Sequence, residues 1–364
     1  MKFGVTVVPR VSDWKLFVDL ETMGYDCAWA ADSQMLYSDA YAVLALAAAH
    51  TSRIRLGTGV AVAPVRLAPV TAHSIATINQ LVPGRVFLGI GTGHTAMRVM
   101  GKESMKARQF REYLRVLRAL LHGEEVDYAL DGDAGAERHQ IRFLHHGQGF
   151  IDVEHPVPIY VAADGPLALK SAGAYGDGRV CSHNQTRGRL QKSLETMRDG
   201  AAAVGRAFPD DFHTAALSYA CVLQPGESMT SDRVIDEIGP MAAATLHYWW
   251  ELYRVDGDTS TVAARCRGLW EEYLAFTEKM ETPDARRYQQ VHFGHCAFLP
   301  PEERRFITED LIRATGGLVG TPDEIIAMLR EREGMGLNEI TLLPGMNEAR
   351  RNLGDFAAKV IARY

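Results

Sequence analysis

The chain has 364 residues, a formal net charge of −6 and a hydrophobic fraction of 47%. This length suits one large α/β barrel or two ordinary domains. A charged fraction of 23% with 9% aromatic residues excludes a disordered or fibrous chain. With 39 basic against 45 acidic residues, the composition argues against nucleic acid as the main partner.

The chain carries no signal for a membrane or for export. No uninterrupted apolar run approaches the roughly 20 residues that a membrane helix needs. A strand-like run begins at Phe3, which leaves no room for a signal peptide. The cysteines are odd in number, lack a CxxC spacing and lie mostly in apolar runs, as is typical of buried thiols in a reducing compartment. We therefore expect a cytoplasmic protein with no membrane partner.

Short β-branched runs alternate with longer helical patterns from the start of the chain. These runs predict strands over residues 3–8, 25–31, 54–61, 86–90, 159–163, 179–182, 214–223 and 339–343. The longer patterns predict helices over residues 13–23, 41–50, 70–81, 105–122, 167–175, 187–204, 323–332 and 348–363.

Eight strands that are each followed by a helix are typical of a parallel sheet closed into a (β/α)8 TIM barrel. A doubly wound open sheet is the alternative. No stretch resembles an interdomain linker, so we expect one barrel domain over residues 1–364. Two segments fall outside the repeat: a loop or small hairpin after the fourth strand (123–156) and a longer, mostly helical insertion after the seventh (225–320). Because βα connections emerge at the C-terminal face of a barrel, the long insertion is expected to cover a ligand there.

The most specific local motif follows the fourth strand, where it reads Gly89-Ile90-Gly91-Thr92-Gly93-His94. Such a turn lets backbone N–H groups approach an anion or a flat ring without hindrance from β-carbons. It lacks the third glycine and the acidic residue of a dinucleotide fingerprint. A tight turn with a purely structural role is the other interpretation.

A second motif lies where the fifth strand meets its helix, at Ala162-Ala163-Asp164-Gly165-Pro166. Small residues and a proline near the first turn expose the helix N-terminus, which suits a phosphate. Because a carboxylate facing a phosphate would repel it, we expect Asp164 to cap its own helix instead. A glycine at the end of the third strand, in Thr58-Gly59-Val60-Ala61, permits a bulge or an unusual peptide geometry.

These motifs together resemble the bacterial luciferase-like superfamily of flavin- and deazaflavin-dependent barrel oxidoreductases. The similarity rests on Gly57–Val60, Ala72–Leu81, Pro83–Val86, Gly89–Gly93, Ala162–Pro166, Gly176–Gly178 and Gly320–Glu324. It spans most of the chain except residues 123–156 and 225–315.

The resemblance implies roles for individual residues. Gly59-Val60 would be a non-proline cis peptide that backs the cofactor ring, and Asp32 would contact that ring. Ala162, Ala163, Gly165 and Pro166 would cradle the cofactor phosphate, whereas Gly91, Thr92, Gly93 and His94 would flank the pocket.

The end of the second strand departs from the deazaflavin-dependent members, which often carry Asp-His where this chain has Asp32-Ser33. A serine is a weaker acid than imidazolium, so this departure argues against the hydride-transfer mechanism of those members and would move the acid–base role to His94. Ser33 and His94 are the catalytic candidates. For His94, a purely positioning hydrogen bond is the alternative.

The long insertion is rich in aromatic residues between His247 and Phe276 and contains His292, His295 and Cys296. Aromatic side chains at near-helical spacing predict a helix-packing core, and a lid over an aromatic or apolar substrate is the alternative. Since no paired carboxylate or CxxC motif accompanies these histidines, the sequence predicts no metal site.

The leading functional hypothesis is an FMN-dependent monooxygenase. Reduced flavin from a separate flavin reductase would react with O2, and a small organic substrate would be oxygenated. The second hypothesis replaces FMN with coenzyme F420, a deazaflavin that transfers hydride. The third is a flavin-binding protein without catalysis. Alanine-rich helix surface around Ala45 and Ala47–Ala49 predicts a homo-oligomer, in the simplest case a dimer.

Overall fold

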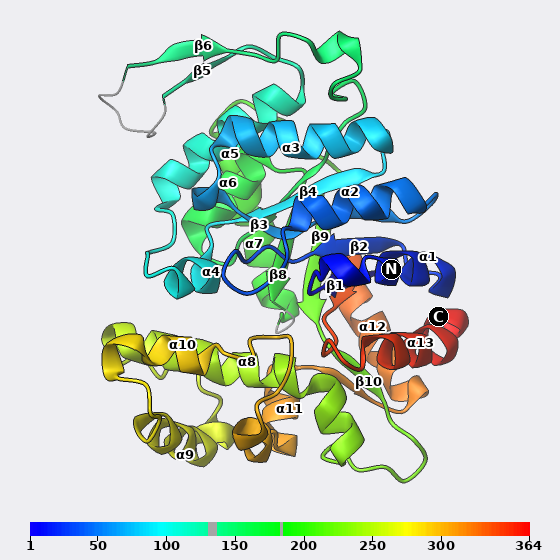
Figure 1. The fold of residues 1–364 in the computed structure, drawn as a ribbon, viewed down its shortest axis with the longest axis vertical. Helices are drawn as coiled ribbons and strands as arrows, with labels where there is room; N and C mark the ends of the chain where they lie inside the picture. Colours follow the sequence, from blue (N-terminus) through cyan, green and yellow to red (C-terminus); the bar gives the residue numbers. More distant parts are fainter. Residues whose placement is uncertain (130–136, 183–184) are drawn as a thin grey trace. The chain divides into compact units, whose positions relative to one another are not determined.

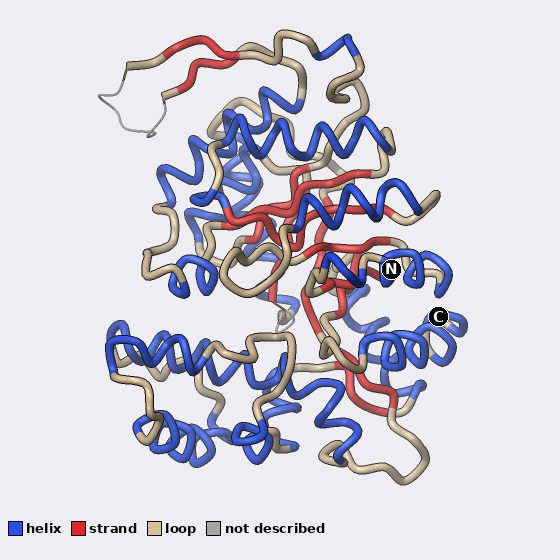
Figure 2. The backbone as a smooth tube through the Cα atoms, in the orientation of Figure 1, coloured by secondary structure: helices blue, strands red, loops and turns tan. Residues whose placement is uncertain are grey.

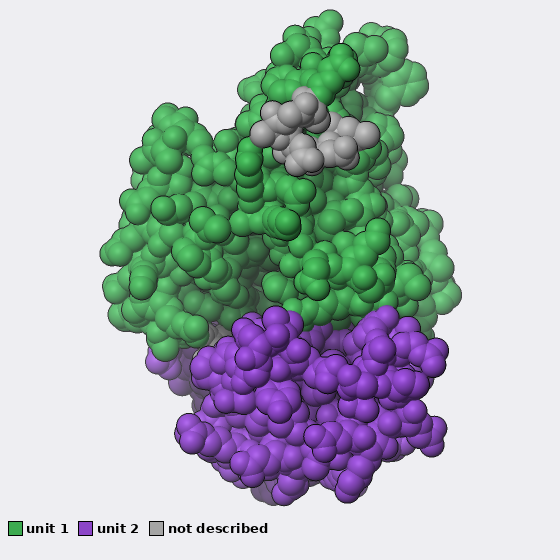
Figure 3. Space-filling model, turned by 90° about the vertical axis from the view of Figure 1, so that its left-hand side faces the viewer, with its two compact units in different colours: residues 1–217, 333–341 green, residues 218–332, 342–364 purple. Residues whose placement is uncertain are grey.

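The computed structural model describes residues 1–129, 137–182 and 185–364 of the chain. The chain forms two compact units, which Figure 3 shows in green and purple. The first unit comprises residues 1–217 and 333–341, and the second comprises residues 218–332 and 342–364.

The first unit is built on a closed barrel of eight strands (Figures 1 and 2). In barrel order these are β1 (Lys2–Val7), β2 (Cys27–Ala30), β3 (Arg55–Val62), β4 (Val86–Gly91), β7 (Ile159–Ala162), β8 (Gly178–Ser182), β9 (His213–Ser218) and β12 (Glu339–Leu342). Neighbouring strands from β1 through β9 pair in parallel. The predicted TIM barrel is confirmed, because a closed ring excludes the open doubly wound sheet.

Helices connect the strands on the outside of the barrel. Those of the first unit are α1 (Lys15–Met23), α2 (Ala40–His50), α3 (Ala68–Leu81), α4 (His94–Val99), α5 (Ala107–Leu121), α6 (Pro166–Tyr175) and α7 (Arg187–Ala202). The apolar residues of α5 recur at helical spacing and are buried, from Tyr113 to Leu121. The short helix α4 was not predicted. After α5, β5 (Val126–Tyr128) pairs antiparallel with β6 (His139–Ile141).

Aromatic and polar side chains fill the barrel interior. The rings of Trp29, Phe87 and Tyr160 pack against one another with centroids 4.4–5.8 Å apart. The buried carboxylate of Glu339 accepts a hydrogen bond from Trp29 Nε1 at 2.7 Å and lies 3.0 Å from His213 Nε2. This packed layer closes the barrel, so a ligand has to bind above it, beyond the C-terminal ends of the strands.

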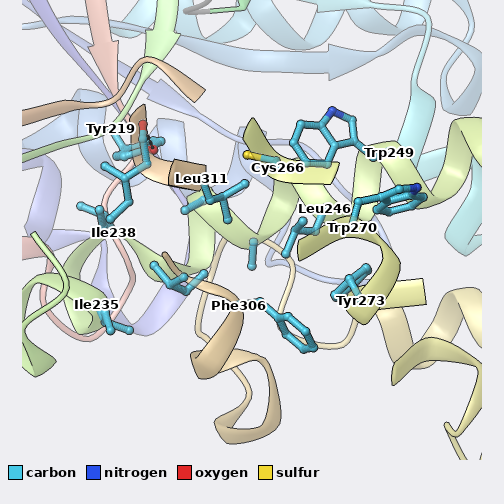
Figure 4. Packing of buried hydrophobic residues seen from close by; sticks show 14 of the residues in the cluster. Tyr219, Ile235, Ile238, Leu246, Trp249, Cys266, Trp270, Tyr273, Phe306 and Leu311 are labelled. Atoms are coloured by element: carbon cyan, nitrogen blue, oxygen red, sulfur yellow. Dashed lines mark hydrogen bonds between the residues drawn. The ribbon is translucent and has the colours of Figure 1, made fainter. Parts of the chain in front are cut away.

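The second unit is mostly helical. Its helices are α8 (Asp232–Asp256), α9 (Arg267–Glu278), α10 (Arg287–Val291), α11 (Glu309–Thr315), α12 (Pro322–Gly334) and α13 (Ala349–Lys359), and β10 (Ala220–Val222) pairs in parallel with β11 (Leu318–Gly320). Its core is aromatic, and Figure 4 shows Trp270, Tyr273 and Phe306 within it. Trp249, Trp250, Trp270 and Tyr273 therefore pack in a helical core, as one of the two interpretations predicted, whereas Tyr248 and Tyr253 are exposed. No helix in the described parts of the chain is long and apolar enough to span a membrane.

One predicted strand was wrong in its extent. Residues 214–223 form two strands, β9 and β10, which are interrupted at Tyr219. Beyond that point the backbone takes a new partner, because Tyr219 accepts a hydrogen bond from the N–H of Leu318 at 2.8 Å. The phenol of Tyr219 is buried and hydrogen-bonded to Thr315. The break therefore marks the residue where the chain changes sheets.

Candidate active site at the C-terminal end of the barrel

Three neighbouring strand ends meet at small residues. A β-carbon at Gly91, the last residue of β4, would lie 3.2 Å from the Ala162 β-carbon of β7 and 3.2 Å from a methyl group of Val60 in β3. Val60 and Ala162 are half-buried and pack on the cluster that contains Trp29. The strand ends therefore present a shallow apolar surface whose shape depends on the absence of a side chain at Gly91.

The end of β3 has the backbone geometry expected from the family resemblance. The peptide between Gly59 and Val60 is cis, and the register with β4 shifts between Thr58 and Ala61. A β-carbon at Gly59 would lie 2.6 Å from the Trp29 β-carbon, so that position has no space for a side chain. The contact of this segment with a cofactor ring stays a prediction.

Asp32, which follows β2, is bound by groups of the protein itself. Its carboxylate accepts hydrogen bonds from the backbone N–H of Val62 at 3.0 Å, from Arg66 at 2.8 Å and from the Gln34 amide at 2.7 Å. The Asp32 side chain is only 2% exposed. These contacts give Asp32 a positioning role for the end of β3, and its predicted contact with a cofactor is untested.

The guanidinium of Arg66 joins Asp32 to Asp39, with each contact at 2.8 Å, and lies 4.7 Å from the ring centroid of Tyr41. Burial alone would lower the pKa of Arg66. The negative charge of Asp32, with smaller contributions from Tyr41 and Asp39, outweighs burial and raises this pKa above its ordinary value. Arg66 therefore stays cationic and serves the ion pairs. Burial raises the pKa of Tyr41 above its ordinary value, so its phenol stays neutral.

Asp164 does not cap its own helix, which corrects the expectation from sequence. Gly165 is the N-cap of α6, with no side-chain capping bond, and Asp164 Oδ1 instead accepts a hydrogen bond from Arg179 at 2.7 Å. Arg179, on β8, also donates from Nε to the Ala163 carbonyl at 2.6 Å and is only 2% exposed. A buried guanidinium requires such a partner. The pairing directs the Asp164 charge toward Arg179 and leaves the helix N-terminus available to an anion.

The two catalytic candidates lie in different surroundings. His94 is the first residue of α4 and is exposed, following Gly93, whose φ of 78° places it in the left-handed region. Ser33 is buried, and its carbonyl accepts the N–H groups of Leu36 and Tyr37. Thr92, between strand and helix, accepts the Met105 N–H at 3.0 Å. Among the two, His94 is the more accessible to a substrate, and both catalytic roles stay predictions.

Sequence reasoning did not find Arg179. Its signal was a lone charge within the short apolar strand Gly178–Ser182, since a charge on a two-sided buried strand requires a counter-charge nearby.

Comparison with known sequences matches a family model for luciferase-like monooxygenases over residues 14–339. An F420-dependent glucose-6-phosphate dehydrogenase of Kineococcus radiotolerans is 32% identical, over 80% of this chain and 88% of its own length. A 5,10-methylenetetrahydromethanopterin reductase of Archaeoglobus fulgidus is 28% identical, over 93% of this chain and 92% of its own length.

Solved structures show the same fold. A coenzyme F420-dependent tetrahydromethanopterin reductase of Methanopyrus kandleri matches with a TM-score of 0.67 at 20% identity, over 100% of this chain and 99% of its own. The monooxygenase RslO1 of Streptomyces bottropensis matches with a TM-score of 0.61 at 19% identity, over 100% of both chains. At these identities the likeness concerns the fold alone.

Proposed function

Because the chain belongs to the luciferase-like monooxygenase family, we propose that it is an oxidoreductase that uses a deazaflavin of the coenzyme F420 class and exchanges hydride with a small organic substrate. The sequence relatives support the deazaflavin alternative over the FMN-dependent monooxygenase, which was the leading hypothesis from sequence. One of these relatives, an F420-dependent glucose-6-phosphate dehydrogenase, is 32% identical to this chain and covers 80% of it. Oxygenating enzymes appear among the structural neighbours below 20% identity.

The residues at the strand ends fit a planar ring. Val60 and Ala162 offer half-buried apolar surface on the Trp29 cluster, and Gly91 leaves the space between them free of a side chain. This cradle of small residues is the observation that carries the proposal. A bulky side chain at Gly91 would occupy the same surface.

The N-terminus of α6 fits the phosphate that both FMN and the deazaflavin carry. Gly165 and Pro166 are exposed there, and the backbone dipoles of the first turn favour an anion. The pairing of Asp164 with Arg179 reduces the repulsion that a free carboxylate would exert.

The bound deazaflavin would supply or accept a hydride, and the chain's own residues would manage the substrate and its proton. His94 would hold or release a proton on the substrate oxygen or nitrogen, a role for which Ser33 is too weak an acid. Asp32 would act indirectly, since its hydrogen bond to Val62 holds the end of β3 in place.

A binding comparison tests the proposal. Purified full-length protein is titrated with the deazaflavin and with FMN, each in both redox states, and binding is followed by tryptophan and cofactor fluorescence. We expect tighter binding of the deazaflavin and no oxygenated product when reduced FMN and O2 are supplied. Preferential FMN binding with formation of an oxygenated product would restore the monooxygenase hypothesis, and binding without turnover of any alcohol, sugar phosphate or imine would favour the non-catalytic alternative.

Two glycine variants make the test specific for the cradle. Gly91→Val should weaken deazaflavin binding by more than about tenfold, because its side chain would fill the surface between Val60 and Ala162. Gly188→Val is the matched control, since a β-carbon there meets nothing within 4 Å. Thermal denaturation of both variants distinguishes a filled cradle from a damaged fold.

A further inference from the structure

Three histidines that lie far apart in the sequence meet inside the second unit. His247 lies on α8, His292 directly follows α10, and His295 lies one turn further on. One ring nitrogen of each histidine lies within 4.8 Å of one from each of the others. His247 and His292 are 1% and 2% exposed. This cluster belongs to no part of the barrel site.

Two buried carboxylates lie beside two of these rings. His247 Nε2 is hydrogen-bonded to Glu303 at 3.1 Å, and His292 Nε2 lies 2.7 Å from Glu251. When His247 donates its Nε2–H to Glu303, its Nδ1 lone pair is free for another partner. Metal-binding histidines commonly have such a carboxylate behind them, because it fixes the ring and makes the ligand nitrogen more basic.

The Nδ1 atom of His247 is buried and has no hydrogen-bond partner among the described residues. Buried polar atoms are rarely left in this state, so an unsatisfied imidazole nitrogen within a cluster of imidazoles points to a missing ligand.

We propose that His247, His292 and His295 bind one divalent transition-metal ion of the Zn²⁺ class. Three imidazoles suit Zn²⁺, Co²⁺ or Ni²⁺, whereas Mg²⁺ and Ca²⁺ prefer oxygen ligands. The carboxylates of Glu251 and Glu303 balance the charge of the ion without binding it. The separation of up to 4.8 Å is wider than the roughly 3.3 Å between tetrahedral ligands at about 2.0 Å from zinc, so the rings move inward by about 1 Å on binding.

The ion would connect two segments of the second unit directly and a third through the hydrogen bond of His247 with Glu303. His247 comes from α8, the other two ligands from the segment after α10, and Glu303 from the 3-10 helix Pro301–Phe306. Metal binding of this kind stabilises the folded state, because the unfolded chain does not assemble the site. The site requires no deazaflavin and stands independently of the proposed function.

The test uses untagged full-length protein freed of metal by a chelator and then titrated with Zn²⁺, Co²⁺ or Mg²⁺. We expect one tight equivalent of Zn²⁺ or Co²⁺, a visible ligand-field spectrum for Co²⁺, a rise in melting temperature with Zn²⁺, and no response to Mg²⁺. His295→Ala should abolish the tight equivalent. Glu303→Gln should weaken it by about 10- to 100-fold, as loss of a carboxylate behind a ligand usually does.

The matched control removes two exposed histidines instead, in the variant His145→Ala/His146→Ala, which should keep the tight equivalent. Circular dichroism of each metal-free variant establishes that it is folded. The proposal is overturned if the wild-type protein binds no tight equivalent, if tight binding survives His295→Ala, or if it is lost in the control. If His295→Ala does not fold, the graded weakening in Glu303→Gln decides the question, and unchanged affinity there contradicts the proposal.

Discussion

The carboxylate of Asp32 accepts the backbone N–H of Val62 at 3.0 Å and so joins the end of β2 to the end of β3. The same carboxylate pairs with Arg66, whose side chain is 16% exposed. We predict that Asp32→Asn lowers the free energy of unfolding by about 1–3 kcal/mol. In this variant the half-buried guanidinium of Arg66 keeps only one charged partner, the exposed Asp39. Urea denaturation of the wild type and the variant measures this difference.

Asp39→Asn is the matched control for that prediction. Asp39 also pairs with Arg66, but its side chain is 54% exposed, and an asparagine can still cap α2 in its place. Its cost should stay within about 0.5 kcal/mol. Equal losses in the two variants would contradict the positioning role of Asp32.

The pairing of Asp164 with Arg179 makes a prediction about cofactor affinity, which rests on the proposed function. Asp164→Asn removes a negative charge beside the N-terminus of α6 and should tighten deazaflavin binding about two- to fivefold at low salt. It should also cost about 1–2 kcal/mol of stability, because Arg179 is buried and loses its carboxylate partner. Fluorescence titration measures the affinity.

Asp199→Asn makes the same change in net charge on the exposed face of α7. If it tightens binding as much as Asp164→Asn does, the effect comes from overall charge and the phosphate is not held at α6.

The barrel strands could be predicted because parallel strands are buried on both faces and read as continuous apolar runs. Residues 86–90 illustrate this, since all of them are buried in β4. The expected end of the seventh strand failed at Tyr219, where an apolar run continues through a change of sheet. The hydrophobicity of a segment indicates that the segment is buried, but it does not identify the strand with which the segment forms hydrogen bonds.

The site was predicted less completely than the fold. The glycine motif at Gly91 was identified from local sequence and the cis peptide at Gly59-Val60 from the family resemblance, whereas the pairing of Asp164 with Arg179 joins the segment after β7 to β8 and has no local signature. The cluster of His247, His292 and His295 was missed for the same reason, because His247 lies far from the other two along the chain. Glu303, which lies beside His247, and Glu251, which lies beside His292, are each also far along the chain from that histidine.

Two helices of the barrel approach each other at glycines, which makes their contact sensitive to a single methyl group. A β-carbon at Gly200 in α7 would lie 2.1 Å from the Lys170 carbonyl of α6. We predict that Gly200→Ala destabilises the protein by about 1–3 kcal/mol, because backbone atoms have to move apart. Gly188→Ala, on the same helix, meets open space and should be neutral or stabilising by up to about 1 kcal/mol. Chemical denaturation of the two variants measures both changes in stability. An unchanged stability of Gly200→Ala would contradict the observed packing.

The carboxylate of Glu21, near the end of α1, holds the segment that leads into β3. It accepts the backbone N–H groups of Arg53 at 2.6 Å and Ile54 at 2.8 Å, and that of Ser52 at 3.0 Å. Burial alone would raise the pKa of Glu21, but these donors together outweigh it and lower the pKa from 4.5 to about 2. The folded state therefore favours the ionised form.

Because the folded pKa lies below the unfolded one, the stabilisation by Glu21 is complete above about pH 4.5 and is lost as the pH falls toward 2. We predict that Glu21→Gln costs about 1–2 kcal/mol at pH 7, a figure reduced for the partial exposure of the carboxylate. The difference from the wild type should shrink across that pH range. Urea denaturation at several pH values measures it, with Glu195→Gln on the exposed face of α7 as the control. A difference that stays constant down to pH 2 would show that the charge of Glu21 contributes nothing to these hydrogen bonds.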